Sequence, residues 1–467
     1  MESVGYNEFI KKYPAYAETS AIDEIRKKDF KRLDKNKHIY LDYTGGNLYA
    51  EAQVEQHHQL LKNNLFGNPH SFNPTSMYST NLVEEARAYV LKYFNAGDGY
   101  YCVFTQNASG ALKIVGESYP FDSNSHFLLT FDNHNSVNGI RQFAKARGAA
   151  YTYNPLLQDT LRLDEAMLEK NLDLHSNAEN KLFAFPAQSN VSGVKHPLSW
   201  IKKAQEKGWD VLLDAAAYVP SNKLDLSVHK PEFASVSFYK IFGYPTGLGC
   251  LLIKKEAFSK LRKPWFAGGT IKMVSVKGDG FYFENGHPKF EDGTINYLDI
   301  PAIKIGLEYI ESIGIGTIGK RIESLTGYAL DEMQKLKHDN GNLLVQIYGP
   351  KDTASRGGTI SMNFYDKHGK VFGFMDVEQE AAKHNISIRT GCFCNPGIDE
   401  TTHSLTEEEL KRYFYNRSDG DFYEMIEFLD KLRGAVRISI GYISSYADIA
   451  AFISFAQQFI NKESKSA

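Results

Sequence analysis

The feature that most constrains this chain is an alternation of short apolar runs with longer amphipathic stretches between residues 109 and 253. The apolar runs predict buried strands, and the stretches between several of them predict helices. The predicted strands are His126–Phe131, Leu182–Phe185, Val211–Asp214, Ala234–Ser237 and Leu248–Ile253. The predicted helices are Ser109–Ser118, Ser136–Arg147 and Ser199–Lys207. Apolar strands separated by helices indicate an α/β fold, in which helices flank both faces of a mainly parallel sheet.

Beyond about Ile303 the pattern changes to longer helices, followed by two predicted strands at Gly358–Phe364 and Val436–Gly441. We therefore expect a large domain over residues 38–302. Residues 1–37 and 303–467 are expected to form a smaller α+β domain. The stretch Asp399–Asp421 is polar and charged, and we interpret it as an insertion.

The composition argues against several classes of partner. The 467 residues include 53 Lys and Arg and 56 Asp and Glu, so the net charge is −3 and no basic excess favours nucleic acid or an anionic membrane surface. No apolar run approaches the ~18 residues that span a bilayer. The polar start predicts no signal peptide. Four cysteines are too few and too scattered for a disulfide framework, which predicts reduced thiols and a cytoplasmic protein.

An acid and a lysine follow two of the predicted strands. Asp214 ends an apolar run, and Lys240 lies on a tight loop before the glycine-rich segment 243–247. Ligands collect at the carboxyl ends of parallel strands, where a carboxylate can pair with a protonated pyridine nitrogen. A partly shielded lysine has a lowered pKa and can form an imine with an aldehyde. A single strand-end acid usually only caps a turn, but this acid and lysine together favour a pyridoxal phosphate site.

Three weaker candidates accompany this pair. His134 follows a predicted strand and could stack on a planar ring, although a lone loop histidine is usually a surface residue. Ala108 and Ser109 bring small residues to a helix start, whose N–H groups either bind phosphate or belong to an ordinary N-cap. Arg437 stands between apolar strand residues and needs an anion, which is either a substrate carboxylate or the partner in a structural ion pair.

The motif Cys392-Phe393-Cys394 has three interpretations. A structural zinc site needs four ligands and the chain has no second cysteine pair of this kind, so we predict no metal. A buried, inert cysteine is the commonest case. The nearby Arg389 and a turn rich in Gly and Pro instead favour an accessible thiolate, the reactive form. A pyridoxal phosphate lysine and a mobile cysteine in one chain suggest chemistry that moves sulfur.

Three segments carry a resemblance to a known family, namely Ser237–Gly247, Phe290–Thr294 and Arg389–Gly397. Together they resemble the class V aminotransferases, which are pyridoxal phosphate enzymes of fold type I. More narrowly, they resemble the molybdenum cofactor sulfurases, relatives of the cysteine desulfurases. The resemblance extends from about Ile39 to Ile453.

This resemblance implies a role for each candidate residue. Lys240 binds the cofactor aldehyde covalently, Asp214 pairs with the pyridinium and His134 stacks on the ring. The other implied cofactor contacts are Asn190 with the phenolic oxygen, and Ala108, Ser109, Ser237 and, from the neighbouring subunit of a homodimer, Thr294 with the phosphate. The implied substrate ligands are Arg437 and Arg389, and the implied persulfide carrier is Cys394, with Cys392 as the alternative.

The implied reaction converts L-cysteine to L-alanine. Lys240 acts as the base at Cα, and the Cys394 thiolate attacks the substrate sulfur. The sulfur then passes to the molybdenum cofactor or to another acceptor on a separate protein. The alternative is a class V aminotransferase, lyase or epimerase acting on another amino acid, with Cys394 incidental. A binding scaffold with an inactive site is disfavoured, because the lysine and the acid are both present.

The chain departs from the family pattern at three points. Tyr239 replaces the histidine of generic desulfurases, in agreement with the sulfurase branch. Ile398 and Asp399 stand where the sulfurase pattern continues with Ala-Cys. The chain ends at Ala467, so we expect no C-terminal domain that binds the molybdenum cofactor, and the identity of the acceptor stays open.

Overall fold

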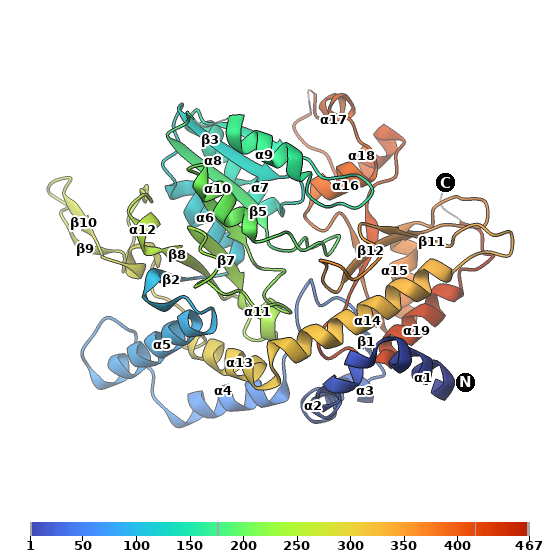
Figure 1. The fold of residues 1–467 in the computed structure, drawn as a ribbon. Helices are drawn as coiled ribbons and strands as arrows, with labels where there is room; N and C mark the ends of the chain where they lie inside the picture. The colour runs from blue at the N-terminus through green and yellow to red at the C-terminus, as the bar shows by residue number, and fades with distance from the viewer. Residues whose placement is uncertain (1, 175–176, 416, 465–467) are drawn as a thin grey trace.

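The computed structural model describes residues 2–174, 177–415 and 417–464. The ends of the predicted smaller domain, residues 1 and 465–467, and residue 416 of the predicted insertion lie outside these ranges. One part of the molecule is built on a seven-stranded sheet flanked by helices, and the other on a four-stranded antiparallel sheet (Figure 1).

The seven-stranded sheet is mainly parallel, as the sequence predicts. Its strand order is β2-β8-β7-β6-β5-β3-β4, and β8 runs antiparallel to both of its neighbours. The strands are β2 (Tyr100–Thr105), β3 (Ser125–Thr130), β4 (Ala150–Asn154), β5 (Asn180–Pro186), β6 (Asp210–Asp214), β7 (Phe233–Ser237) and β8 (Gly249–Lys254). The five predicted strands correspond to β3, β5, β6, β7 and β8, whereas β2 and β4 were not predicted.

Buried side chains alternate between the two faces of this sheet, as the twofold period of a strand requires. On one face, Leu129 and Leu212 belong to a core shared with α6 and α8. On the other face, Leu128 and Leu213 belong to a core shared with α9, α10 and α13. These helices are α6 (Ala108–Ser118), α8 (Ile140–Ala146), α9 (Glu165–Leu174), α10 (Ser199–Glu206) and α13 (Ile300–Ile313).

One predicted helix is divided. The stretch 136–147 contains α7 (Asn135–Asn138) and α8, on either side of Gly139, a residue that lowers helix propensity. The predicted division of the domains at residues 302 and 303 falls within α13, and the domain boundaries stay a prediction.

The smaller part contains a sheet of order β11-β12-β15-β14. Its strands are β11 (Val345–Tyr348), β12 (Thr359–Phe364), β14 (Arg389–Gly391) and β15 (Ala435–Ser439), and the helices in its core are α14 (Ile315–Lys335), α15 (Phe374–Lys383) and α19 (Tyr446–Gln457). The N-terminal helix α1 (Glu2–Lys12) contributes Phe9 to this core. Close by, β1 (Ile39–Tyr40) pairs with β13 (Ile386–Ser387), so the segment after the first helices is tied to the C-terminal part.

Two regions project from the body of the molecule (Figure 1). The stretch interpreted as an insertion includes most of α16 (Pro396–Thr402) and all of α17 (Glu407–Phe414), and it is followed by α18 (Phe422–Leu429). At the opposite side, β9 (Ile271–Val274) and β10 (Phe281–Phe283) form a hairpin.

Within the described ranges, no helix combines the length and the apolar character needed to cross a lipid bilayer.

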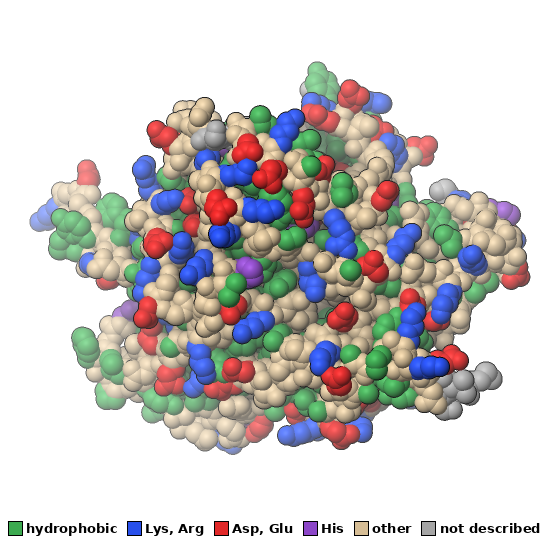
Figure 2. Space-filling model, viewed as in Figure 1, with side chains coloured by type: hydrophobic (Ala, Val, Ile, Leu, Met, Phe, Trp, Pro, Cys, Tyr) green, Lys and Arg blue, Asp and Glu red, His purple; other side chains and the backbone are tan. Residues whose placement is uncertain are grey.

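The surface in Figure 2 mixes positive and negative side chains, without a large patch of either sign on this face. Hydrophobic side chains gather on the projecting hairpin of β9 and β10 at the left of the view. The exposed hydrophobic residues of this hairpin are Met273, Val274, Val276, Phe281 and Tyr282.

Candidate active site

The predicted site residues follow the carboxyl ends of neighbouring strands. His134 comes after β3, Asn190 after β5, Lys240 after β7, and Asp214 is the last residue of β6. Ser109 lies just beyond β2, which runs in the same direction as β7 because both are antiparallel to β8. The topology therefore brings segments more than 100 residues apart in the sequence to one edge of the sheet, where ligands of parallel sheets bind.

These side chains line one cavity of about 330 Å³. Seven of the predicted site residues belong to its lining, namely Ala108, Ser109, His134, Asn190, Asp214, Ser237 and Lys240. The other predicted residues do not line it: Thr294 is exposed elsewhere, and Arg389, Arg437 and Cys394 lie outside the lining. The structure thus brings these seven residues together around one cavity, and their roles in it stay a prediction.

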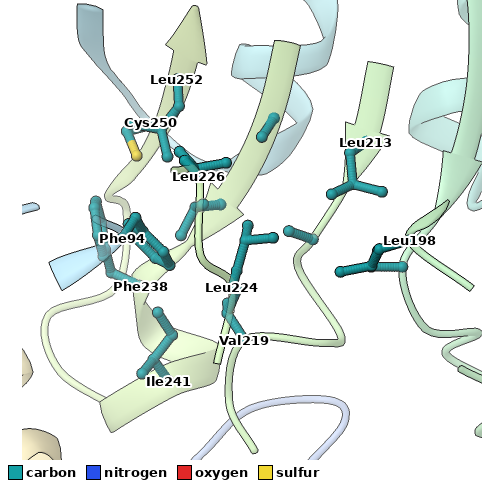
Figure 3. Packing of buried hydrophobic residues seen from close by; sticks show 14 of the residues in the cluster. Phe94, Leu198, Leu213, Val219, Leu224, Leu226, Phe238, Ile241, Cys250 and Leu252 are labelled. Atoms are coloured by element: carbon teal, nitrogen blue, oxygen red, sulfur yellow. The ribbon is translucent and has the colours of Figure 1, made fainter. Parts of the chain in front are cut away.

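Lys240 lies on a short helix, α11 (Phe238–Phe242), and not on the loop that the sequence predicted. Phe238 and Ile241 point into the core on the far side of this helix (Figure 3), which directs Lys240 toward the cavity. Among the described residues, its ammonium has no hydrogen-bond or ion-pair partner. Burial lowers the pKa of Lys240, while the negative charge of Asp214 acts in the opposite direction.

Asp214 is oriented by its own strand end. Its Oδ1 accepts hydrogen bonds from the Ser235 hydroxyl at 3.0 Å and from the Ala216 N–H at 3.1 Å. Its Oδ2 has no hydrogen-bond partner among the described residues. One oxygen is therefore held by the protein, and the other is left for a cationic group in the cavity.

His134 caps the short helix α7, and this contact determines its tautomer. Its Nδ1 accepts the Ser136 N–H at 3.1 Å, so the neutral ring carries its proton on Nε2. The Ser136 hydroxyl lies 3.1 Å from the same nitrogen and 2.6 Å from the Ser109 hydroxyl. Burial lowers the pKa of His134, which keeps the imidazole uncharged at neutral pH.

One end of the cavity is suited to a phosphate. The N-terminus of α6 borders it, with the Ser109 and Ser237 side chains alongside. Gly249 of β8 approaches the start of α6 so closely that a Cβ there would lie 2.6 Å from the Asn107 carbonyl carbon. Backbone N–H groups, hydroxyls and the helix dipole favour an anion here.

The donor set of the cavity fits pyridoxal phosphate. A helix start suited to a phosphate, a half-satisfied carboxylate for the pyridine nitrogen and a lysine with a lowered pKa for the aldehyde line one cavity. Asn190 also fits a contact with the phenolic oxygen: its side chain uses one N–H to donate to the Phe393 carbonyl, and an amide has two.

The two cysteines of the motif differ in exposure. Cys394 is exposed, whereas Cys392 is half-buried. Burial raises the pKa of Cys392, and Asp399 adds to this effect. Phe393 and Cys394 both adopt left-handed backbone conformations, with φ of 56° and 55°, which cost about 1–3 kcal/mol each when the residue is not glycine. Contacts from outside the loop are needed to maintain this shape.

Cys394 is electrostatically close to the lysine. A negative charge on its sulfur raises the pKa of Lys240, so the two side chains lie within electrostatic range of each other. The Cys394 carbonyl accepts the Asn135 N–H at 2.8 Å, which joins the cysteine to the segment that carries His134. The thiol therefore belongs to the surroundings of the cavity, although it does not line it.

The two predicted substrate arginines share one carboxylate. Arg437 donates from Nη2 to Asp42 at 2.9 Å, and Arg389 donates from Nη2 to the other oxygen of Asp42 at 2.6 Å. Arg437 also donates to the Asn190 carbonyl and faces the Phe393 ring at 4.7 Å. Its side chain is 3% exposed, while that of Arg389 is 52% exposed. The ion pair considered as the alternative for Arg437 is thus present, and its buried Nε has no partner among the described residues.

Sequence reasoning missed three residues of this region, namely Asp42, Ser136 and Asn395. The Asn395-Pro396 pair carries a readable signal, because asparagine followed by proline is typical of a helix start. No pattern in the sequence links Asp42 to arginines more than 340 residues away. At the second departure from the family pattern, Asp399 forms a buried ion pair with Arg433.

The fold and this cavity define a class of protein: the chain belongs to the aminotransferase class-V family, whose model matches residues 39–452. Within that family it is similar to molybdenum cofactor sulfurases. It is 37% identical to that of Solanum lycopersicum over 95% of this chain, and 37% identical to that of Bos taurus over 93%. The chain spans only 58% and 51% of the length of these two relatives.

Solved structures share the fold. A cysteine desulfurase from Thermococcus onnurineus superposes with a TM-score of 0.75 and 25% identity, covering 94% of this chain and 98% of the other. A cysteine desulfurase from Escherichia coli gives a TM-score of 0.72 and 20% identity, with the same two coverages. The predicted fold class is confirmed.

Proposed function

We propose that this protein is a pyridoxal phosphate-dependent cysteine desulfurase of the molybdenum cofactor sulfurase type. The observation that carries the proposal is a half-buried Lys240, without a partner among the described residues, in a cavity whose neighbouring loop presents the exposed thiol of Cys394. Similarity to the sulfurases over almost the whole chain supports it. A cavity lysine alone would suit any class V enzyme, and the thiol beside it is what favours sulfur transfer.

Each part of the site has a task in the proposed reaction. Asp214, His134, Asn190, Ser109, Ser237 and the start of α6 would hold pyridoxal phosphate, which supplies an electron sink when bound. Lys240 takes the proton from the substrate Cα, and burial, which lowers its pKa, favours the basic amine form that this step needs. Arg437 is the candidate ligand of the substrate carboxylate, which would take the place of Asp42 beside its guanidinium.

The sulfur transfer balances without a further reactant. The Cys394 thiolate attacks the sulfur of L-cysteine, an S–S bond forms and the C–S bond breaks. The substrate carbon is reduced and protonated to give L-alanine, and the thiol becomes a persulfide. The net change is L-cysteine plus thiol to L-alanine plus persulfide. The acceptor is then the molybdenum cofactor or another acceptor on a separate protein.

We also propose that the chain works as a homodimer. Thr294 is exposed and lies outside its own cavity, next to a hollow lined by Phe72, Gly293 and Ile295. Phe72 is 95% exposed, and a second copy covering this apolar surface would bury it. Sedimentation velocity tests the proposal, and a monomer at micromolar concentration would contradict it.

Mass spectrometry after incubation with L-cysteine and pyridoxal phosphate tests the main proposal. The wild-type protein should gain one sulfur atom on the peptide that contains Cys394 and release alanine. The C392S variant should behave in the same way, because Cys392 is half-buried, whereas C394S should gain none. Bound cofactor with a keto acid as the product, and no persulfide, would instead favour a different class V reaction.

A further inference from the structure

The cysteine loop, residues 392–397, is held in place by side-chain amides. Asn395 is fully buried, and its Nδ2 donates to the Asp132 carbonyl at 2.7 Å and to Asn190 Oδ1 at 2.9 Å. Its Oδ1 accepts the Ile398 N–H at 3.3 Å and so caps α16. The Oδ1 of Asn395 therefore caps the helix, and its Nδ2 bonds the two loops, of Asp132 and Asn190, that line the cavity.

The contacts fasten the loop on both sides of the reactive cysteine. Asn190 donates to the Phe393 carbonyl at 2.9 Å, one residue before Cys394. The Asn135 N–H donates to the carbonyl of Cys394 itself at 2.8 Å. The next residue, Asn395, is held by the hydrogen bonds that its side chain donates to Asp132 and Asn190. Three consecutive positions are thus bonded to the segments that follow β3 and β5.

The loop does not hold this shape by local preference. Phe393 and Cys394 are both left-handed, a conformation that favours glycine. Phe393 faces the guanidinium of Arg437 at 4.7 Å, which adds one contact from the smaller sheet. Without the side-chain amide contacts, the loop would keep the hydrogen bond from the Asn135 N–H to the Cys394 carbonyl but lose those at Phe393 and Asn395.

We propose that Asn395 is a positioning residue for the Cys394 thiol: the donors of its amide tether the cysteine loop to the segments carrying His134 and Asn190. The proposal rests on the proposed function for its consequence, because the thiol must be held near the bound substrate to accept sulfur. Its structural half, the tether itself, is independent of that function.

The variant N395D tests the donor of the side chain separately from its acceptor. Aspartate keeps an acceptor for the Ile398 N–H and remains a good helix cap. It has no donor, and when ionised it would face the Asp132 carbonyl and Asn190 Oδ1 with oxygen atoms. N395S is a second variant that preserves the cap, in case the aspartate is poorly accommodated. N73D is the matched control, because Asn73-Pro74 starts α5 with the same kind of cap.

Hydrogen exchange of the holoenzyme is the first measurement. In N395D, amide protons of residues 133–138 and 391–398 should exchange about fivefold faster, as expected for the loss of a hydrogen bond. Residues 233–242, which include Lys240, should exchange as in the wild type. N73D should leave all three segments unchanged. Unaltered exchange around Cys394 in both N395D and N395S, or equal acceleration around Lys240, would overturn the tether.

Persulfide formation in a single turnover is the second measurement. In N395D it should fall about tenfold, while the spectral change that L-cysteine causes in the bound cofactor should match that of the wild type. Wild-type persulfide formation in N395D would overturn the positioning role. If the wild-type protein forms no persulfide at all, the proposed function fails, and the exchange experiment still decides whether Asn395 tethers the loop.

Discussion

Lys240 and Cys394 approach the same cavity from two differently built regions. Lys240 stands on α11 between Phe238 and Ile241, which are buried in the core of the large sheet (Figure 3). Cys394 stands on a loop with a strained backbone, which is held by amides from distant segments. The lysine is fixed by hydrophobic packing and the thiol by hydrogen bonds, so the two can be disturbed separately. In the proposed reaction the lysine acts on the substrate and the thiol carries the sulfur, and each group is held by its own set of contacts.

The largest effects should come from removing each reactive group. K240A should lose covalent cofactor attachment and slow alanine formation by about 10,000-fold or more, because attachment and the base disappear together. C394S should retain the cofactor and its spectral response to L-cysteine, but form no persulfide. Cofactor absorbance and alanine release in a single turnover measure both. Alanine release by C394S at the wild-type rate would remove the thiol from the mechanism.

Two glycine substitutions should each disturb one region, G397A the loop of Cys394 and G249A the cavity of Lys240. In G397A the new Cβ would lie 1.9 Å from the Phe131 carbonyl oxygen, and in G249A it would lie 2.6 Å from the Asn107 carbonyl carbon. Each should lower the free energy of unfolding by about 1–3 kcal/mol. G397A should slow persulfide formation with cofactor affinity kept, whereas G249A should weaken cofactor affinity.

The control for this pair is G316A, because a Cβ at Gly316 in α14 would meet no atom within 4 Å. Thermal unfolding and cofactor titration of the three variants provide the comparison. If G249A binds the cofactor as tightly as the wild type, the phosphate end of the cavity is not where we propose it to be.

The smallest effect concerns pH. The pKa of Lys240 is lowered by burial, so the uncharged amine predominates at a lower pH than for a lysine in water. The rate at which the apoprotein binds pyridoxal phosphate covalently should rise with pH and level off below the ordinary lysine pKa of about 10.4. In D214N the inflection should move to lower pH, because the negative charge that raises the pKa is gone. An upward move would contradict this electrostatic account.

The lysine region could be predicted from the sequence because its signals are local. Apolar runs identify β5, β6 and β7, and the residues at their ends, Asp214 among them, follow from strand topology. The strand β2 was missed, although its residues Cys102, Val103 and Phe104 are buried. The exposed residues at the start of β4, an edge strand, do not give the continuous apolar run of a buried one.

The cysteine region could be predicted only in part. Its motif was recognised, but the position of the loop depends on Asn190 and Asp132, which lie 205 and 263 residues from Asn395. Likewise, the choice between a substrate and an ion pair for Arg437 depended on Asp42, 395 residues away. Hydrogen bonds between single polar residues leave no periodic trace, whereas a packed strand does.

The lowered pKa of Lys240 has a consequence for selectivity. A nucleophilic amine without a protein partner can form an imine with an aldehyde that enters the cavity. The lysine itself cannot discriminate among such aldehydes. In the proposed site, discrimination would be left to the other end of the cavity, where Ser109, Ser237 and the start of α6 would hold a phosphorylated compound longer. The phosphate end would thereby protect the lysine from occupation by the wrong carbonyl compound.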